Sequence, residues 1–390
     1  MKKLFLILLW CICLYSDRSD FVNLDSARQS QIEASATDRE RPFPIGKADE
    51  EDRFGKVGAS PNSQNLSDRC IYGIETDFDD IVVGSSPFSL FEAIYKRCLG
   101  RRVLVVEQGA ECGGAWKSLT ICGVPHVDLG CHEFGRDHRL VAFLEEYAGC
   151  NIVDTTPAQN KPVPNGEFYL SEGCYELTRN LEHLMDHVGV TLLLNSKLES
   201  VFIDTTREIA EVKINGMRFT TFKLIVTNNS NISIENPEVQ SNPHRPHTYY
   251  HVGMLIEDPT PPRFTYKNLR TGGASRSTNY TCYSKELQGT GKQLITVQVH
   301  GEQNLANAPN FLEELRKQGL IDANAKLLQT ENYIYQQVAF NQSALSKLGA
   351  AAIFEIINTS HITNLANSID KWKTVMKPWK EVMAPLSQVE

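Results

Sequence analysis

Two short apolar runs separated by an amphipathic segment mark the start of regular structure in the chain. Ile81–Val83 and Val103–Val106 are continuous apolar runs, typical of strands buried on both faces of a sheet. Between them, Pro87 opens a segment with apolar residues at helical spacing and basic residues near its end. The pattern predicts a strand–helix–strand unit.

Further periodicity predicts helices and a β meander after this unit. Helices are expected over 140–147 and 173–187, and a proline-containing loop over 151–165. Asn215-Gly216 is a strong hairpin signal between two alternating runs. The strands expected here cover 190–194, 198–203, 209–214, 217–222 and 224–227.

From residue 247 the pattern changes to that of an antiparallel sheet. Strands are expected over 249–256, 264–266, 278–283, 294–300 and 327–335, with one helix over 309–318. A final strand over 353–357 and a helix over 362–375 suggest a return to the first sheet. We therefore expect an α/β fold in which 71–246 and 346–384 form one domain and 247–345 form an inserted antiparallel α+β domain.

The N-terminal segment differs from the rest. Residues 1–16 combine a charged start with a short apolar run, the layout of a secretory signal, although no small-x-small pair precedes Asp17. Residues 17–70 are polar and charged and are expected to be a disordered linker. Export or membrane anchoring through the leader and an adventitious apolar start in a cytoplasmic protein both remain open.

Composition excludes some partners. The formal net charge of −8 and the absence of a basic run with interleaved aromatics argue against nucleic-acid binding. The 10 cysteines contain no Cys-x-x-Cys pair and are expected to be reduced core residues. Membrane contact is expected only through the leader, and the composition does not indicate an oligomeric state.

The turn after the first strand carries candidate chemistry. Gly84, Ser85, Ser86 and Pro87 link a buried strand to a helix, an arrangement that turns backbone N–H groups and the helix N-terminus toward a pyrophosphate. A complete Gly-x-Gly-x-x-Gly fingerprint needs glycine where Ser86 and Ser89 stand. The alternative is a strand–helix–strand unit that binds no nucleotide.

An acid and a glycine pair complete this candidate site. Glu107 follows the second strand, where a carboxylate accepts hydrogen bonds from ribose hydroxyls; a surface carboxylate at a strand end is the alternative. Gly113 and Gly114, shortly before Trp116, would let the backbone pass close to the pyrophosphate, unless they form an ordinary loop turn.

These motifs together resemble the FAD-dependent superfamily of flavin amine oxidases, protoporphyrinogen oxidase, phytoene desaturase-like enzymes and UDP-galactopyranose mutase. The resemblance covers most of 80–376 and rests on the turn at Gly84, on Glu107 and on the Gly113-Gly114 pair. It implies a Rossmann-type FAD/NAD(P)-binding domain, FAD as cofactor, and a further cofactor contact near Val201. The family's closing flavin-contact motif is not recognisable near 358–361.

Two residues are candidates for direct roles in catalysis. The segment 128–134 resembles the "Gly-Pro-His-x-Phe" loop of the mutase branch, which implies that His132 lies near the flavin; a hydrogen-bonded loop histidine is the alternative. Arg276 matches a family arginine that binds an anionic substrate, or is a solvated strand residue. His244, His247 and His251 lack an acid or thiol at ligand spacing and do not indicate a metal site.

Three functions follow from this interpretation. The resemblance favours an FAD-dependent, amine oxidase-like oxidoreductase acting on a small organic substrate between two domains. A mutase-like flavoenzyme acting on a nucleotide sugar is the second. A non-catalytic binding protein that kept the fold and lost the cofactor is the third, indicated by Ser86, Ser89 and the missing closing motif.

Overall fold

The computed structural model describes residues 76–128, 134–135, 137–154, 167–227, 232–237, 247–269, 273–337, 352–357 and 363–384. Contacts divide the chain into two compact units, Met1–Val57 and Gly58–Glu390, and every described residue belongs to the second. The leader over 1–16, the whole linker over 17–70, and His132 are therefore outside the described residues. The domain boundaries expected at 246 and 345 remain predictions.

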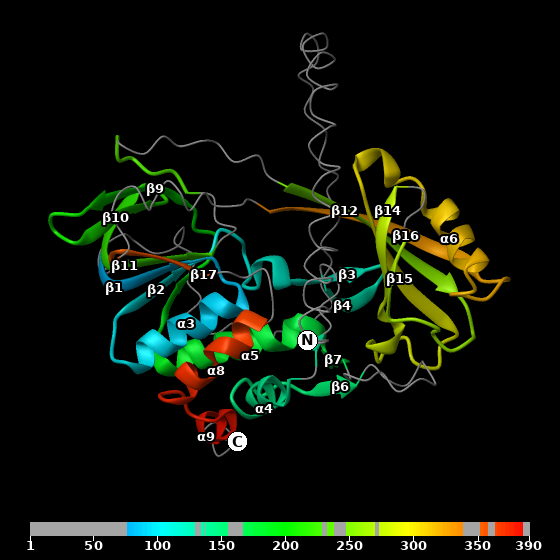
Figure 1. Ribbon diagram of the computed structural model, residues 1–390, viewed down its shortest axis with the longest axis horizontal. Coiled ribbons are helices and arrows are strands. Elements are labelled where there is room, and N and C mark those ends of the chain that lie inside the picture. The colour runs from blue at the N-terminus through cyan, green and yellow to red at the C-terminus, as the bar shows by residue number, and fades with distance from the viewer. Residues whose placement is uncertain are drawn as a thin grey trace, which may run out of the picture. The chain divides into compact units, whose positions relative to one another are not determined.

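The first sheet has seven strands (Figure 1). They are β1 (Asp77–Val83), β2 (Val103–Val106), β8 (Thr191–Leu193), β9 (Leu198–Asp204), β10 (Ile209–Ile214), β11 (Met217–Thr227) and β17 (Phe354–Ile357). The order is β8-β2-β1-β11-β10-β9, and β17 pairs with the second half of β11. Because β8, β2, β1, β11 and β17 are parallel neighbours, their carboxyl ends share one edge of the sheet.

One strand was wrongly divided by the sequence pattern. The runs at 217–222 and 224–227 form a single strand, β11. Its first half pairs antiparallel with β10 and its second half pairs parallel with β1 and β17, so two apolar patterns meet without a break. The hairpin at Asn215-Gly216 is confirmed, with φ of 47° and 80°, both in the left-handed region.

Three helices cover one face of this sheet. These are α3 (Pro87–Cys98), α5 (Gly173–Val188) and α8 (Thr363–Lys373), which lie together in Figure 1. Their apolar faces share a core with Val82, Val105 and Ile225, whereas the alternate residues Ile81 and Leu104 belong to a second core with the β9–β10 meander. Burial on both faces explains why β1 and β2 are continuous apolar runs.

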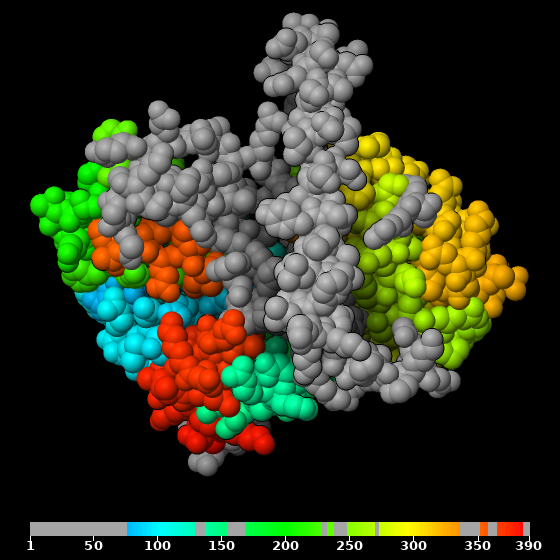
Figure 2. Space-filling view, viewed as in Figure 1, coloured from blue at the N-terminus to red at the C-terminus, as the bar shows by residue number. Residues whose placement is uncertain are grey.

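The C-terminal end of the chain packs beside α3 and α4 (His138–Glu146). Figure 2 shows the red residues of α8 and α9 (Trp379–Met383) beside α4. Phe91 of α3 stacks on Trp372 of α8 with ring centroids 4.8 Å apart. The chain thus returns, after the second sheet, to complete the first core.

Lys371 holds α8 to α3 by an ion pair at this contact. Its Nζ lies 2.9 and 2.8 Å from the two carboxylate oxygens of buried Glu92, whose other cation, Lys96, is 3.7 Å away. We expect Lys371→Ala to lower the free energy of unfolding by about 1–2 kcal/mol, because a buried carboxylate loses its closer partner. Urea denaturation measures this change. Lys377→Ala, at an exposed position, is the matched control, and equal losses in both variants would contradict the prediction.

The second sheet has five strands in the order β13-β14-β15-β12-β16. They are β12 (His247–Glu257), β13 (Tyr266–Asn268), β14 (Ala274–Asn279), β15 (Lys292–Val299) and β16 (Lys326–Gln337). One face packs on α6 (Ala308–Lys317) through residues such as Val252, Ile295 and Phe311. All pairings in this sheet are antiparallel, as expected.

Three local predictions, two in the second sheet and one before it in the chain, were wrong. The strand expected over 278–283 ends at Asn279, because the Asn279 side chain accepts a hydrogen bond from Thr281 N–H (3.1 Å) and starts a 3-10 turn, Tyr280–Cys282. The strand expected from Phe264 begins at Tyr266. Within the expected loop over 151–165, β6 (Ile152–Asp154) forms because it pairs with β7 (Glu167–Leu170), a distant partner.

Two small sheets complete the fold. β3 (Ser118–Ile121) and β4 (Val124–Asp128) form a hairpin, and β5 (Phe134–Gly135) joins β7 and β6. The hairpin contacts the second sheet where Cys122 N–H donates to a carboxylate oxygen of Glu331 over 2.6 Å. None of the described helices is long and apolar enough to span a membrane.

Candidate functional site

The carboxyl edge of the first sheet brings three predicted segments together. Gly84 follows β1 and Glu107 follows β2, while Thr227 ends the parallel neighbour β11. Gly84 has φ +90°, and a Cβ on it would lie 3.4 Å from Oγ1 of Thr227. Glycine is therefore required at this turn by its backbone conformation, and the turn packs closely against the end of β11.

Ser86 and Ser89, which replace two fingerprint glycines, contact each other. Their hydroxyl oxygens are 2.9 Å apart, and the Ser86 hydroxyl also accepts from Ser89 N–H over 3.4 Å as the N-cap of α3. Pro87 occupies the first turn of α3, as predicted from its position. The Ser86 hydroxyl thus caps Ser89 N–H and is not directed out of the turn. Because Pro87 has no N–H, Phe88 N–H is the first-turn donor of α3 that this cap leaves for an anion.

Glu107 is the centre of a hydrogen-bond network at this edge. One carboxylate oxygen accepts from Ser85 N–H (3.1 Å) and from the Ser85 hydroxyl (2.6 Å); the other accepts from Gly109 N–H (2.7 Å). The side chain is not on the open surface, because Glu107 is only 8% exposed. Since an ionised carboxylate has about four acceptor directions, one of them, on the second oxygen, stays available to a ligand hydroxyl.

The loop with the glycine pair lies against the same turn. Gly113 N–H donates to the Ser85 carbonyl (3.0 Å) and to the Ser85 hydroxyl (3.1 Å). Gly113 and Gly114 have φ of +119° and +56°, and a Cβ on Gly114 would lie 3.9 Å from Ser86 N. Trp116 is buried edge-on against Phe88, with ring centroids 5.5 Å apart. A side chain at Gly114 would thus fill space beside the N-terminus of α3.

Val201 lies elsewhere, in the middle of β9. Its side chain is fully buried in the core under the meander. Its N–H donates to the Ser233 carbonyl and its carbonyl accepts from Glu235 N–H, both over 2.8 Å. The pairing occupies the main-chain groups of Val201 and the core encloses its side chain, so the cofactor contact expected near Val201 stays a prediction.

A half-buried acid that the sequence analysis missed lies beside the glycine loop. Burial raises the pKa of the Glu182 carboxyl, on α5, which neighbours Cys112. Burial likewise raises the pKa of the Cys112 thiol, and the Glu182 carboxyl adds to that effect. Cys112 is therefore a neutral thiol and a poor nucleophile. The helical position of Glu182 alone did not indicate its burial.

Glu182 makes stability dependent on pH in a definite direction. Because the pKa of Glu182 in the folded protein lies above the ordinary 4.5, folding disfavours its charged form. Its contribution to the free energy of unfolding therefore falls as the pH rises from 4.5 through the raised pKa, and is constant at higher pH. The difference in free energy of unfolding between Glu182→Gln and the wild type is therefore expected to be more favourable to the variant at about pH 8 than at about pH 4. Urea unfolding at both pH values measures the difference, and a pH-independent difference would be the contrary result.

The second sheet presents a row of polar side chains on the face opposite α6. In the strand register, Arg276 on β14 is paired with Gln298 on β15, which is paired with His251 on β12, which is paired with Tyr333 on β16. The next pair along the same face is Tyr249 with Tyr335. Arg276, predicted as a substrate ligand, therefore stands at one end of a continuous row that the sequence analysis did not find.

Several groups in this row have no hydrogen-bond partner among the residues that the structure describes. They are Nε2 of His251, the Tyr333 hydroxyl and Oε1 of Gln298. Burial, helped by the Arg276 charge, lowers the pKa of His251 to about 3, so this imidazole is neutral. Burial raises the pKa of Tyr335 to about 12, so the phenol stays protonated. Unpaired buried polar groups are costly, and a polar ligand would satisfy them.

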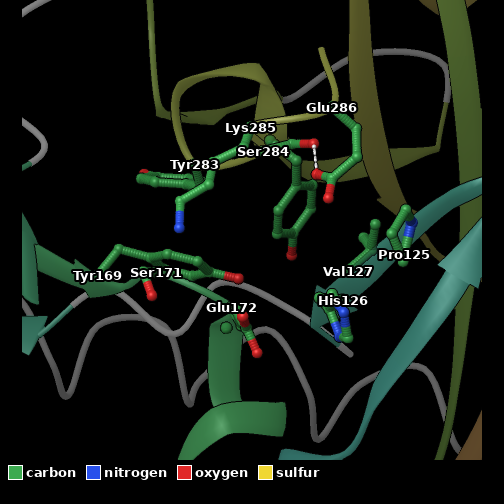
Figure 3. Close-up of a pocket in the computed structure, with 12 residues that line it drawn as sticks. Pro125, His126, Val127, Tyr169, Ser171, Glu172, Tyr283, Ser284, Lys285 and Glu286 are labelled. Atoms are coloured by element: carbon green, nitrogen blue, oxygen red, sulfur yellow. Dashed lines mark hydrogen bonds between the residues drawn. The ribbon is translucent and has the colours of Figure 1, made fainter. Parts of the chain in front are cut away.

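A separate cavity of about 70 Å³ lies at the start of α5 (Figure 3). Tyr169, Tyr280 and Tyr283 line it together with Glu172 and Lys285, whose amine points toward Tyr169 in Figure 3. A cavity of this size has room for water molecules and is too small for a flavin. Among the described residues, no group of three or more His, Cys, Asp or Glu side chains could hold a metal ion.

Comparison with known proteins identifies the fold. No family model and no curated protein matches the sequence. Among solved structures, an oxidoreductase from Methanosarcina mazei is similar, with a TM-score of 0.54 and 12% identity over 76% of this chain and 99% of that one. A putrescine oxidase bound to putrescine is also similar, with a TM-score of 0.51 and 12% identity over 80% of this chain and 99% of that one. The chain therefore shares the mixed α/β fold of these oxidoreductases.

Proposed function

We propose that this protein is an FAD-dependent oxidoreductase that binds FAD at the carboxyl edge of the first sheet. The observation that carries the proposal is the Glu107 network, in which the acid after β2 is joined to the turn after β1 and to the Gly113 loop. In a parallel α/β sheet, ligands bind at this edge. The fold shared with known oxidoreductases supports the same assignment.

The residues at this edge fit a dinucleotide. The N-terminus of α3 and the turn at Gly84 would face the pyrophosphate, and the free acceptor direction of Glu107 would bind a ribose hydroxyl. Gly113 and Gly114 would keep the neighbouring loop free of side chains. When bound, FAD supplies a two-electron acceptor for the oxidation of an organic substrate.

The polar face of the second sheet would bind the substrate. Arg276 would contact an anionic group, while neutral His251 and Tyr333 would supply hydrogen bonds without adding charge. The role of His132 near the flavin is a further part of the proposal, carried by the resemblance of its segment alone. A mutase-like reaction on a nucleotide sugar would use the same arginine, and is distinguished by binding of a uridine diphosphate sugar and a requirement for reduced flavin.

The visible absorption spectrum of the purified full chain tests the proposal. We expect a flavin spectrum with about one FAD per chain, identified after release by denaturation. A colourless protein that takes up no added FAD would reject the flavoenzyme and leave the non-catalytic binding protein. The engagement of Glu107 by Ser85 and Gly109 would then be the physical reason, since together they fill three of its acceptor directions.

A further inference from the structure

The cavity at the start of α5 contains a buried hydroxyl that is unpaired in the described part of the chain. Tyr169, on β7, is 2% exposed and stacks on Tyr283 with ring centroids 4.1 Å apart. Its hydroxyl has no hydrogen-bond partner among the described residues, and Figure 3 shows it pointing into the space between Glu172 and His126. Burial raises the pKa of this phenol well above its ordinary value, so the hydroxyl stays protonated and is a donor. An unpaired buried donor is costly, and a ligand that brings an acceptor would satisfy it.

A second donor faces the same cavity from the second sheet. Lys285 lies shortly after the 3-10 turn Tyr280–Cys282, and its amine points toward Tyr169 (Figure 3). Within the part of the chain that the structure describes, the Lys285 side chain has no hydrogen-bond or ion-pair partner. Its ammonium carries three N–H donors and a positive charge. A phenol from β7 and an ammonium from this turn therefore face one cavity, and both are donors.

The two carboxylates that line the cavity have partners. Glu172 lies 3.2 Å from the Arg179 guanidinium. Glu286 accepts from the Ser284 hydroxyl over 2.9 Å, and a hydrogen bond from its own backbone N–H lowers the pKa of its carboxyl. The acceptors in the cavity are thus engaged by the chain, whereas its two unpartnered groups are donors. This difference favours a ligand that accepts hydrogen bonds and carries a negative charge.

The N-terminus of α5, which also borders the cavity, is engaged by the chain as well. Cys174 N–H donates to the Asp128 carboxylate over 2.9 Å, and Tyr175 N–H donates to the Ser118 hydroxyl over 3.0 Å. The Ser118 hydroxyl donates in turn to Asp128 over 2.5 Å, so this buried carboxylate is compensated. A ligand in the cavity would therefore be bound by side chains and not by the helix N-terminus.

The size of the cavity limits the ligand. Its volume of about 70 Å³ is about half that of an engineered cavity that binds benzene. A molecule of about half the size of benzene, such as formate or acetate, therefore fits. Tyr169 is buried and Lys285 is exposed, so such a molecule would enter past Lys285 and reach the phenol at the inner end.

We propose that this cavity binds a small carboxylate of about the size of acetate, which accepts hydrogen bonds from the Tyr169 hydroxyl and the Lys285 ammonium. The charge of Lys285 balances that of the ligand. The bound carboxylate joins β7 to the turn that follows β14, and so connects the elements around the two sheets. The site shares no residue with the proposed FAD site or with the polar face of the second sheet, and does not depend on either.

Ligand-observed NMR titration of the full chain with acetate tests the inference. We expect acetate to bind with a Kd of about 1 mM, since a ligand with so few atoms makes few contacts. Methylammonium, which is of similar size and opposite charge, should bind at least about tenfold more weakly. Sodium chloride keeps the ionic strength equal in all samples. Equal or tighter binding of methylammonium, or no binding of acetate at about 50 mM, would overturn the inference.

Tyr169→Phe separates ligand binding from folding. Phenylalanine keeps the stack on Tyr283 and removes only a hydroxyl, so urea denaturation without acetate should show an unchanged or slightly higher free energy of unfolding. Acetate affinity should fall at least about tenfold. Retained acetate affinity, or a marked loss of stability without acetate, would show that the hydroxyl is not a free donor for this ligand and would refute the site.

Lys285→Gln and Lys292→Gln form a matched pair. Lys285→Gln should lose at least about tenfold in acetate affinity, because the charged partner is removed. Lys292 is also exposed, at the start of β15, but does not line the cavity, so Lys292→Gln should bind acetate as the wild type does. Retained binding in Lys285→Gln together with lost binding in Arg276→Gln would place the anion on the second sheet and overturn the inference.

The two proposals fail in different ways. A colourless protein that binds acetate through Tyr169 and Lys285 rejects the flavoenzyme and keeps the carboxylate site. A flavin-containing protein that does not bind acetate keeps the proposed function and loses the carboxylate site. Titrations with and without added FAD should give the same acetate affinity, since the cavity shares no residue with the Glu107 network.

Discussion

Glu107→Gln is expected to reduce FAD affinity by roughly 30- to 150-fold, the equivalent of about 2–3 kcal/mol. An amide in place of the carboxylate has one acceptor oxygen and adds a donor. That donor would face Ser85 N–H or Gly109 N–H, which both donate to Glu107. The turn after β1 would lose its anchor to β2, and the ribose hydroxyl would lose a charged acceptor. Flavin fluorescence during titration of apoprotein with FAD measures the affinity.

Glu111→Gln is the control for this variant. Glu111 belongs to the same loop, but its carboxylate is 68% exposed and pairs with Lys117. Exposed ion pairs contribute little, so FAD affinity should change less than about twofold. Unaltered affinity in Glu107→Gln, together with wild-type folding by circular dichroism, would remove Glu107 from the cofactor site.

The first part of the site was predictable because its signals are local in sequence. β1, α3 and β2 follow one another, and Pro87, the buried runs and Glu107 each carry a short-range preference for their structure. What the sequence did not reveal is the partner of each polar group. The Ser85 hydroxyl could have faced solvent, yet it fills an acceptor site on Glu107. Such choices depend on side-chain rotamers at the turn, which no pattern of residue types determines.

The row on the second sheet was beyond sequence analysis for a different reason. Tyr249 and His251 alternate with Tyr250 and Val252, which face the α6 core, whereas Tyr333 and Tyr335 on β16 alternate with exposed Asn332 and Ile334, so only β12 carried the alternating signal of a half-buried strand. Whether His251 stands opposite Tyr333 depends on the register between strands that are distant in the chain. A slip of one residue would place these side chains on the other face. Only the folded structure supplies that register.

Gly173 is a position where a single methyl group is expected to damage the fold. Its φ is +60°, and a Cβ would lie 2.6 Å from a carboxylate oxygen of Asp128, 2.8 Å from the Tyr169 hydroxyl and 2.9 Å from the His126 carbonyl. We expect Gly173→Ala to lower the free energy of unfolding by about 3 kcal/mol or more, because overpacking adds to the cost of the left-handed backbone. Urea denaturation measures this loss.

The steric clash would displace Asp128, which makes several hydrogen bonds. Its carboxylate accepts from Cys174 N–H (2.9 Å) at the start of α5 and from the Ser118 hydroxyl (2.5 Å), and its carbonyl accepts from the Tyr280 hydroxyl (3.0 Å). Asp128 thus joins α5 and the β3–β4 hairpin to the turn that follows β14, so moving it would loosen all three.

Gly123→Ala separates the two contributions to this loss. Gly123 also has a left-handed φ, +78°, but a Cβ there would meet nothing within 4 Å. Gly123→Ala should therefore lower the free energy of unfolding only by the cost of a left-handed backbone at alanine, about 1–2 kcal/mol. The excess loss in Gly173→Ala then measures the crowding of the three oxygens. Equal losses at the two glycines would mean that Asp128 moves aside freely, and that the junction between α5 and the second sheet is looser than these contacts imply.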